Sequence, residues 1–347
     1  MKKTKLQKFT ALFLSVFLLA GALSACGSGE NGSSAPVSSG AAVSGEVSQA
    51  EPFKIGLIQF TEHPSLDTIR ESFMARIEEW GYDESKIVID YQNGNADTAN
   101  LNSICQKFVG DKVDMIVAIA TPAAQIALSA AEGTDIKVVF AAVNNPAKDL
   151  GIQKPDAPEG NITGTSDQIP VSSTIDLALQ VNPELETLGL LYNSGESNSV
   201  DAVEAAKAYC AEKGLEVVEG TVSNTSEIQQ VATDLCTKVD AIFTSTDNSI
   251  ASNLPVVAEA AKTAKIPFYV GADSMVKDGA LAAIGIDYTK LGAETADQAI
   301  EILEGRPVSE IPVKFFTTYD TYINQTTLDA LGLTFPEDLL SSAIFFN

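Results

Sequence analysis

Polar side chains that suit hydrogen bonding to a small ligand stand just after short apolar runs of the chain. His63, Thr121 and Asp247 each lie in a segment that directly follows such a run. When apolar runs form parallel strands, their carboxyl ends bring the following loops to one edge of the sheet. We therefore expect these side chains to line a common cleft and to bind a polar molecule there.

The pair Thr121-Pro122 predicts the start of a helix, with the threonine hydroxyl as the cap and proline at the first helical position. The free N–H groups and the positive end of the helix dipole at such a terminus suit a carboxylate. Thr121 therefore has two open roles, contact with a ligand in the cleft or capping of its own helix.

Three aspartates are candidates to receive an ammonium group by a charge-assisted hydrogen bond. Each of the three follows an apolar run at a predicted cleft edge. We rank Asp247 first, Asp273 second and Asp287 third. Each of them also suits a purely structural role as the N-cap of a helix.

Arginine usage narrows the ligand class. The three arginines are Arg70, Arg76 and Arg306, and none stands in a predicted cleft loop. The anionic end of a ligand is therefore expected to meet amides and hydroxyls, and a zwitterion with one carboxylate and one ammonium fits this arrangement. Aromatic residues near the loop bases suit either an apolar ligand side chain or core packing; they are Phe60, Tyr192 and Tyr288.

The motifs argue against catalysis. His63 is the only histidine, and no G-x-S-x-G sequence follows a predicted strand, so no hydrolase triad is expected. The sequence has no Walker motif, which excludes the ATPase of a pump, and no C-x-x-C or Cys/His cluster for a metal. We expect no cofactor, and a net charge of −24 argues against a nucleic-acid partner.

The amino terminus predicts export. Residues 1–25 have a lysine-rich start and an apolar stretch of about 15 residues, too short to span a membrane, as in a secretory signal. Leu23-Ser24-Ala25-Cys26 resembles the lipobox of bacterial lipoproteins, which implies lipidation of Cys26. Residues 26–51 are rich in Gly and Ser and predict a flexible linker. The other cysteines, Cys105, Cys210 and Cys236, are expected to be buried small hydrophobes.

Beyond the linker, apolar strand-like runs alternate with amphipathic helical stretches, which predicts an α/β fold with doubly wound parallel sheets. The pattern then repeats. Lys112-Val113-Asp114 has a counterpart in Lys238-Val239-Asp240, and the two triplets open corresponding strands. This duplication predicts two similar lobes.

The late segments are expected to cross between the lobes and make a three-segment hinge. A helix is predicted over 292–305, and the alternating segment 311–324 is predicted as a strand. The first lobe is assigned residues 52–165 and 288–314. The second lobe is assigned residues 166–287 and 315–347.

Several segments together resemble one family. They are HPSLD (63–67), GDKVDMIVAIATPAAQIAL (110–128), NITGTSD (161–167), YNSGESNS (192–199), STDNSIAS (245–252) and GIDYTKLG (285–292). In this order they resemble the substrate-binding lipoproteins of ABC importers, the TrpX-like group above all, with the type I periplasmic-binding-protein fold. The family's cleft loops match 121–125, 193–196 and 246–248. The candidate ligand contacts are Phe60, His63, Thr121, Ala123, Gln125, Asn193, Ser194, Glu196, Asp247, Asn248, Asp273 and Asp287.

The resemblance implies capture of an amino acid, often an aromatic one, and its delivery to a membrane permease driven by a separate ATPase. It also implies a monomer tethered by lipid to the outer face of the cytoplasmic membrane. Two alternatives stay open, a ligand-sensing module for a signalling receptor and a binding protein for a sugar or nucleoside. An enzyme is disfavoured by the missing catalytic set.

Overall fold

The computed structural model describes residues 51–347. The predicted signal peptide, the lipidation site at Cys26 and the linker up to residue 50 lie outside the described residues. Within 51–347, none of the helices combines the length and the apolar character that crossing a bilayer would require.

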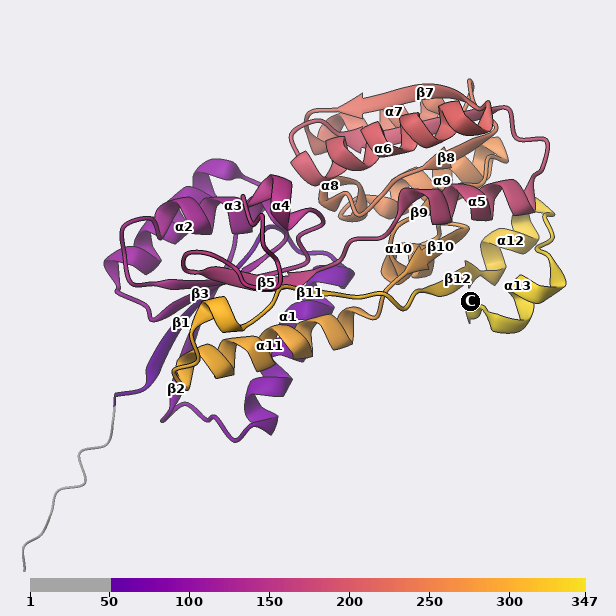
Figure 1. Ribbon diagram of the computed structural model, residues 1–347. Helices are drawn as coiled ribbons and strands as arrows, with labels where there is room; N and C mark the ends of the chain where they lie inside the picture. Colours follow the sequence, from indigo (N-terminus) through magenta and orange to yellow (C-terminus); the bar gives the residue numbers. More distant parts are fainter. Residues whose placement is uncertain (1–50) are drawn as a thin grey trace, which may run out of the picture. The chain divides into compact units, whose positions relative to one another are not determined.

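The first lobe is built on a sheet in which all neighbouring strands are parallel, in the order β11-β5-β4-β3-β1-β2 (Figure 1). The strands are β1 (Phe53–Gln59), β2 (Ile87–Asn93), β3 (Met115–Ile119), β4 (Lys137–Ala141), β5 (Ile162–Ser166) and β11 (Lys314–Phe315). The accompanying helices are α1 (Pro64–Glu79), α2 (Thr98–Gly110), α3 (Thr121–Ala130), α4 (Pro146–Asp149) and α11 (Tyr288–Leu303).

The second lobe is built on a sheet in the order β13-β12-β10-β9-β8-β6-β7, parallel except between β10 and β12. Its strands are β6 (Thr187–Asn193), β7 (Glu216–Val222), β8 (Ala241–Phe243), β9 (Phe268–Val270), β10 (Ala282–Gly285), β12 (Asp320–Asn324) and β13 (Ile344–Phe346). The α-helices are α5 (Val171–Val181), α6 (Ser197–Lys213), α7 (Ile228–Leu235), α8 (Asn248–Ala251), α9 (Leu254–Ala264), α10 (Asp273–Lys277), α12 (Gln325–Leu331) and α13 (Glu337–Ser342). The chain also contains two short 3₁₀ helices. They are η1 (Thr225–Glu227), which precedes α7, and η2 (Val308–Glu310), which lies between α11 and β11.

The predicted duplication is confirmed in both topology and detail. The first five strands of each lobe share the order 2-1-3-4-5, counted from the start of the lobe. Asp114 Oδ2 accepts a hydrogen bond from the Lys54 N–H at 2.7 Å, and Asp240 Oδ2 accepts one from the Thr187 N–H at 2.9 Å. The repeated aspartate thus bonds the start of the neighbouring strand in each lobe. The α/β fold with two parallel-sheet lobes is as predicted, and it is of the type I periplasmic-binding-protein kind.

Three segments connect the lobes. The first follows β5, the second lies between β10 and α11, and the third lies between β11 and β12. The single strand predicted over 311–324 is therefore wrong, because β11 pairs with β5 in the first sheet and β12 pairs with β10 in the second. The exact lobe boundaries at 165/166, 287/288 and 314/315 stay a prediction.

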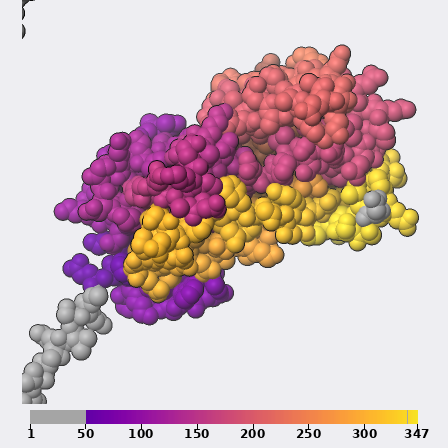
Figure 2. Space-filling model, viewed as in Figure 1, coloured from indigo at the N-terminus to yellow at the C-terminus, as the bar shows by residue number. Residues whose placement is uncertain are grey.

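Helix α11 returns to the first lobe and packs along α1. Figure 2 shows the orange segment that contains it against the indigo and magenta part of the surface. It begins at Tyr288, earlier than the predicted 292, because Asp287 caps it by accepting from the N–H groups of Thr289 and Lys290. Arg76 of α1 forms a two-pronged ion pair with Asp297 of α11, with Nε–Oδ1 2.7 Å and Nη2–Oδ2 3.2 Å.

The cysteines behave as small buried hydrophobes. Cys105, Cys210 and Cys236 are all buried, as predicted, and all three are free thiols. Burial raises the pKa of the Cys105 thiol to about 12, so this side chain stays protonated and unreactive in the folded protein.

The contact between α1 and α11 depends on Gly292. A methyl group at this position would overlap Ser72 Oγ and the carbonyl oxygen of Ile69. We expect Gly292→Ala to lower the free energy of unfolding by about 1–3 kcal/mol through overpacking, as measured by urea denaturation. Gly110→Ala is the matched control, because a methyl group at the end of α2 meets nothing within 4 Å. Equal stability of the two variants would contradict the predicted close packing.

Candidate functional site

A small cavity lies where the strand ends of the first lobe meet those of the second. It is lined by His63, Ser65, Leu66, Thr121, Ala142, Asn144, Asp167, Asn198, Thr246, Asp247, Asn248, Ala251, Ala272, Met275 and Tyr288. These residues follow strands or begin helices in both lobes, which is the usual position of ligand sites in doubly wound α/β folds.

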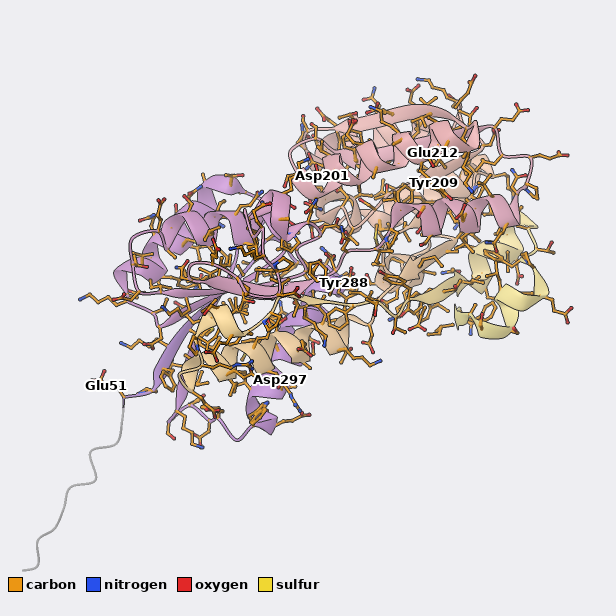
Figure 3. The ribbon with its side chains drawn as sticks, viewed as in Figure 1. Glu51, Asp201, Tyr209, Glu212, Tyr288 and Asp297 are labelled. Atoms are coloured by element: carbon orange, nitrogen blue, oxygen red, sulfur yellow. The ribbon has the colours of Figure 1, made fainter. Side chains whose placement is uncertain are left out.

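Direct hydrogen bonds join the two lobes around this cavity. His63 Nε2 lies 3.1 Å from Asn248 Oδ1, and Ser65 Oγ lies 2.5 Å from Ser274 Oγ. A further pair between the lobes joins Lys148 of α4 to Asp201 of α6, which Figure 3 labels at the first-lobe end of that helix. The structure is therefore a closed form.

Three residues that line the cavity each have a buried polar atom with no hydrogen-bond partner within the protein. The atoms are Asp167 Oδ1, Asn198 Oδ1 and His63 Nδ1. Asn198 donates through Nδ2 to the carbonyl of Thr246 at 3.1 Å, so its free atom is an acceptor. Because buried polar groups are normally paired, these atoms mark positions where a ligand can bond.

Asp167 is the cavity carboxylate with a free oxygen. Its other oxygen, Oδ2, accepts from the Tyr288 hydroxyl at 3.4 Å. Burial raises the pKa of Asp167 to about 6, because it lacks a cationic partner. Asp167 follows β5 in the first connection between the lobes. Tyr288, which Figure 3 labels, begins α11 after the second. The two side chains therefore tie the cavity to the connecting segments.

Glu196 supports the cavity from behind. Its Oε2 accepts from the backbone N–H and the side-chain amide of Asn248, at 3.1 and 2.6 Å. Its Oε1 accepts from the backbone N–H and hydroxyl of Ser249, at 2.9 and 2.7 Å. Burial and the neighbouring Asp247 carboxylate raise the pKa of Glu196. The bond from Nδ2 fixes the orientation of the Asn248 amide, and the other three hold the first two residues of α8.

Two long helices of the first lobe begin at the cavity. Ser65 and Leu66 lie in the first turn of α1, and Thr121 is the first residue of α3. The first N–H groups of a helix have no acceptor within the helix and carry partial positive charge. Together the two termini suit a carboxylate.

The predicted capping role of Thr121 is wrong. The cap position is Ala120, which has a φ of 79°, and no side chain caps the helix. The left-handed turn at Ala120 shifts the helix start by one residue, so Pro122 is the second helical residue and the Thr121 hydroxyl does not cap α3.

Asp247 lies on the cavity wall, but both of its oxygens already accept backbone hydrogen bonds. Oδ1 accepts from the Ile250 N–H at 2.8 Å as the cap of α8, and Oδ2 accepts from the Asn193 N–H at 2.7 Å. Burial raises the pKa of Asp247. Its assignment to a ligand ammonium stays a prediction, and its observed bonds give it a structural role.

The other two ranked aspartates lie outside the cavity wall. Asp273 forms an ion pair with Lys277 at 2.7 Å, and Asp287 caps α11 and pairs with Lys290 at 3.1 Å. Each has a partner on its own helix.

The remaining predicted contacts divide into two groups. His63 and Asn248 lie on the cavity wall with Thr121 and Asp247. Six predicted contacts do not line it. Phe60 and Ala123 are buried in the first lobe, and Gln125 bonds Ser197. Asn193 and Glu196 hold the loops behind the cavity, and Ser194 bonds the carbonyl of Val222.

Two residues of the wall are absent from the predicted ammonium partners or contacts. The sequence places Asp167 only in the family-like segment 161–167, and it suggests Tyr288 only as an aromatic residue for the ligand or the core. The signal that identifies Asp167 is its position directly after a strand end, the criterion already applied to Asp247. The small apolar residues Ala142, Ala251 and Ala272 give no comparable signal.

Between residues 51 and 347, no group of three or more His, Cys, Asp or Glu side chains is arranged to hold a metal ion. The polar groups of the cavity, chiefly acceptors and helix-terminal N–H groups, can instead bind an organic ligand by hydrogen bonds.

Comparison with known proteins identifies relatives over nearly the whole described chain. The model of a family described as ABC transporter substrate binding protein matches residues 54–345. A protein of Clostridioides difficile (strain R20291) named tyrosine-binding protein is 39% identical over 280 residues, which are 80% of this chain and 81% of that protein.

Two solved structures give a comparison of states. One is an ABC domain from Streptococcus pneumonia in complex with L-Trp, at 36% identity, with a TM-score of 0.81 and coverage of 85% of this chain and 99% of that one. The other is the ligand-free, open structure of a Clostridium difficile substrate-binding protein with adhesive properties, at 36% identity and the same coverages, with a TM-score of 0.64. The better match to the complex agrees with the closed arrangement.

Replacing Asp247 tests its structural role. We expect Asp247→Ala to lower the free energy of unfolding by about 1–2 kcal/mol, because the cap of α8 and the bond to the Asn193 N–H are both lost. Asp287→Ala is the control, a partly exposed cap whose loss costs about 0.5–1 kcal/mol in the same urea titration. Unchanged stability of Asp247→Ala with loss of ligand binding would return this residue to the ammonium role.

Proposed function

Because the chain belongs to the family of ABC transporter substrate-binding proteins, we propose that it captures an aromatic amino acid between its two lobes. It is a binding protein and not an enzyme. The relatives named for tyrosine and solved with L-Trp support this ligand class. In this proposal, closure around the ligand prepares it for transfer to a permease.

The observation that supports the proposal most directly is the set of unpaired acceptors on the cavity wall. Asp167 Oδ1 has no partner and belongs to the carboxylate there that retains a free oxygen. Asp167 is buried without a cationic partner. A ligand ammonium would supply that partner through a charge-assisted hydrogen bond. Asp167 therefore replaces Asp247 as the proposed ammonium partner.

The carboxylate of the ligand is assigned to the first turns of α1 and α3. No arginine lines the cavity, and the backbone N–H groups near Ser65 and Thr121 are the donors that remain. The hydroxyls of these two residues add further donors.

Apolar groups on the wall suit the ligand side chain. They are Leu66, Ala142, Ala251, Ala272, Met275 and the ring of Tyr288. Small alanines leave room for a flat ring, and a methionine sulfur packs well against an aromatic edge. This combination favours an aromatic side chain over a polar one.

Binding at this position would be coupled to closure. Asp167 lies on the first connection between the lobes and Tyr288 directly follows the second, whereas Asn198 and Asn248 belong to the second lobe and Thr121 to the first. A ligand that bonds all of these groups is held fully only when the lobes are closed, so it shifts the population toward the closed form.

The cellular role is the finer part of the proposal. The predicted signal sequence and Cys26 support a lipoprotein on the outer face of the cytoplasmic membrane. In this setting a monomer delivers its ligand to an ABC permease with a separate ATPase. The family match supports this importer role.

A panel of analogues tests the ligand class. In isothermal titration calorimetry, we expect L-Trp, L-Tyr or both to bind with micromolar or tighter affinity, about −8 kcal/mol. Tryptamine, which lacks the carboxylate, and indole-3-propionate, which lacks the ammonium, should each bind at least tenfold more weakly. If a sugar or nucleoside binds and every amino acid fails, the ligand class is wrong. Equal affinity for all three indoles would contradict the zwitterion site.

The Asp167 assignment predicts a pH dependence. Only the ionised carboxylate forms an ion pair with an ammonium group, so affinity should fall as the pH drops through the pKa of Asp167, which burial in the closed form raises to about 6. Burial lowers the pKa of His63 to about 4, so its ring does not titrate in this range. Asp167→Asn should weaken binding by about 2 kcal/mol at pH 7.5 and flatten the profile. Asp278→Asn is the control, because burial also raises the pKa of Asp278 but it lies outside the cavity wall. An unchanged profile in Asp167→Asn would remove Asp167 from the ammonium site.

A further inference from the structure

The hydrogen bond between His63 and Asn248 has a defined direction. Asn248 donates its side-chain amide N–H to Glu196 Oε2 at 2.6 Å, so its carbonyl oxygen Oδ1 faces the histidine. An amide oxygen can only accept, so His63 Nε2 carries the proton and donates it across 3.1 Å. The Glu196 carboxylate, through Asn248, thereby fixes the tautomer of His63.

The other ring nitrogen of His63, Nδ1, is consequently unprotonated, and its lone pair can accept a hydrogen bond. Nδ1 is buried and has no partner within the protein. His63 occupies the cap position of α1, but its side chain does not cap the helix. Because burial keeps the ring neutral above about pH 5, Nδ1 remains an acceptor over the physiological range.

The cavity limits which ligand group this acceptor can face. A carboxylate oxygen would repel the lone pair. The ammonium is assigned to the charged Asp167, and an ammonium N–H that also reached Nδ1 would bond every amino acid alike. The other donor on an aromatic amino acid is a polar hydrogen on the ring, the N–H of an indole or the O–H of a phenol. Resting on the proposed function, we infer that His63 is a specificity-determining residue that selects rings bearing such a donor and rejects phenylalanine.

The selection follows from the cost of leaving a buried acceptor unpaired. With tryptophan or tyrosine in the cavity, Nδ1 gains its missing hydrogen bond. With phenylalanine, closure buries the lone pair against carbon, and that penalty reduces affinity. His63 belongs to the first lobe, and Asn248 and Glu196 belong to the second, so the acceptor is oriented only in the closed form.

Two ligand pairs test the inference by calorimetry. L-Tyr against L-Phe removes the ring donor with a loss of volume, and L-Trp against 1-methyl-L-Trp removes it with a gain of volume. A penalty shared by both pairs therefore cannot come from size. We expect the donor-bearing member of each pair to bind about 10- to 100-fold more tightly to the unaltered protein.

Two substitutions separate the two nitrogens of His63. Glutamine places its polar end near the position of Nε2 and keeps the bond to Asn248, but it leaves no acceptor near Nδ1. Asparagine places its oxygen near Nδ1 and loses the bond to Asn248. We expect His63→Gln to reduce the preference within each pair to less than threefold, and His63→Asn to retain most of it. Tyr209→Phe is the control, because its hydroxyl bonds Asp176 outside the cavity, and it should keep the full preference.

The outcomes distinguish this inference from the proposed function. If no aromatic amino acid binds, the proposed function fails and the inference falls with it. If all four bind equally to the unaltered protein, the inference alone is overturned. It is also overturned if His63→Gln weakens all ligands by one common factor, which would place Nδ1 on the ammonium. Loss of the preference in Asn198→Ala with its retention in His63→Gln would assign the ring donor to Asn198 and overturn the inference as well.

Discussion

Closure of the two lobes buries three hydrogen-bond acceptors that the protein does not pair by itself. An unpaired buried acceptor costs about 1–3 kcal/mol, so Asp167, Asn198 and His63 together oppose closure unless a molecule with matching donors lies between the lobes. In the proposed function, this constraint makes the closed form conditional on its ligand, since a ligand shifts an equilibrium only by its differential affinity for the two states. The other features of the site either supply these acceptors or hold them in place.

The fold supplies them through its duplication and its connections. Two parallel sheets with the same strand order direct their loops to one junction, and the first turns of α1 and α3 add positive helix ends from one side. Asp167 lies on the first connection and Tyr288 directly follows the second, so the connecting segments and their immediate neighbours contribute to the cavity wall. Behind the wall, Glu196 turns the amide of Asn248 toward His63. Recognition and closure are thus parts of one hydrogen-bonded arrangement.

The sequence predicted the architecture well because apolar runs and helical periods are local signals. The duplicated strands and the crossings all followed from them. The segment 311–324 failed because local alternation does not reveal that its two halves pair in different sheets. The site was harder to predict. Asp247 and Asp167 look alike in sequence, and what separates them is whether nearby backbone N–H groups, such as those of Asn193 and Ile250, already satisfy the carboxylate. That information exists only in three dimensions.

The most direct test of the account is a crystal structure of the protein with a bound aromatic amino acid. The account predicts closed lobes, with the ligand ammonium nitrogen about 2.9 Å from Asp167 Oδ1 and the ligand carboxylate at the first turns of α1 and α3. An ammonium group bonded to Asp247 instead, or a ligand bound to open lobes with Asp167 exposed to water, would contradict it.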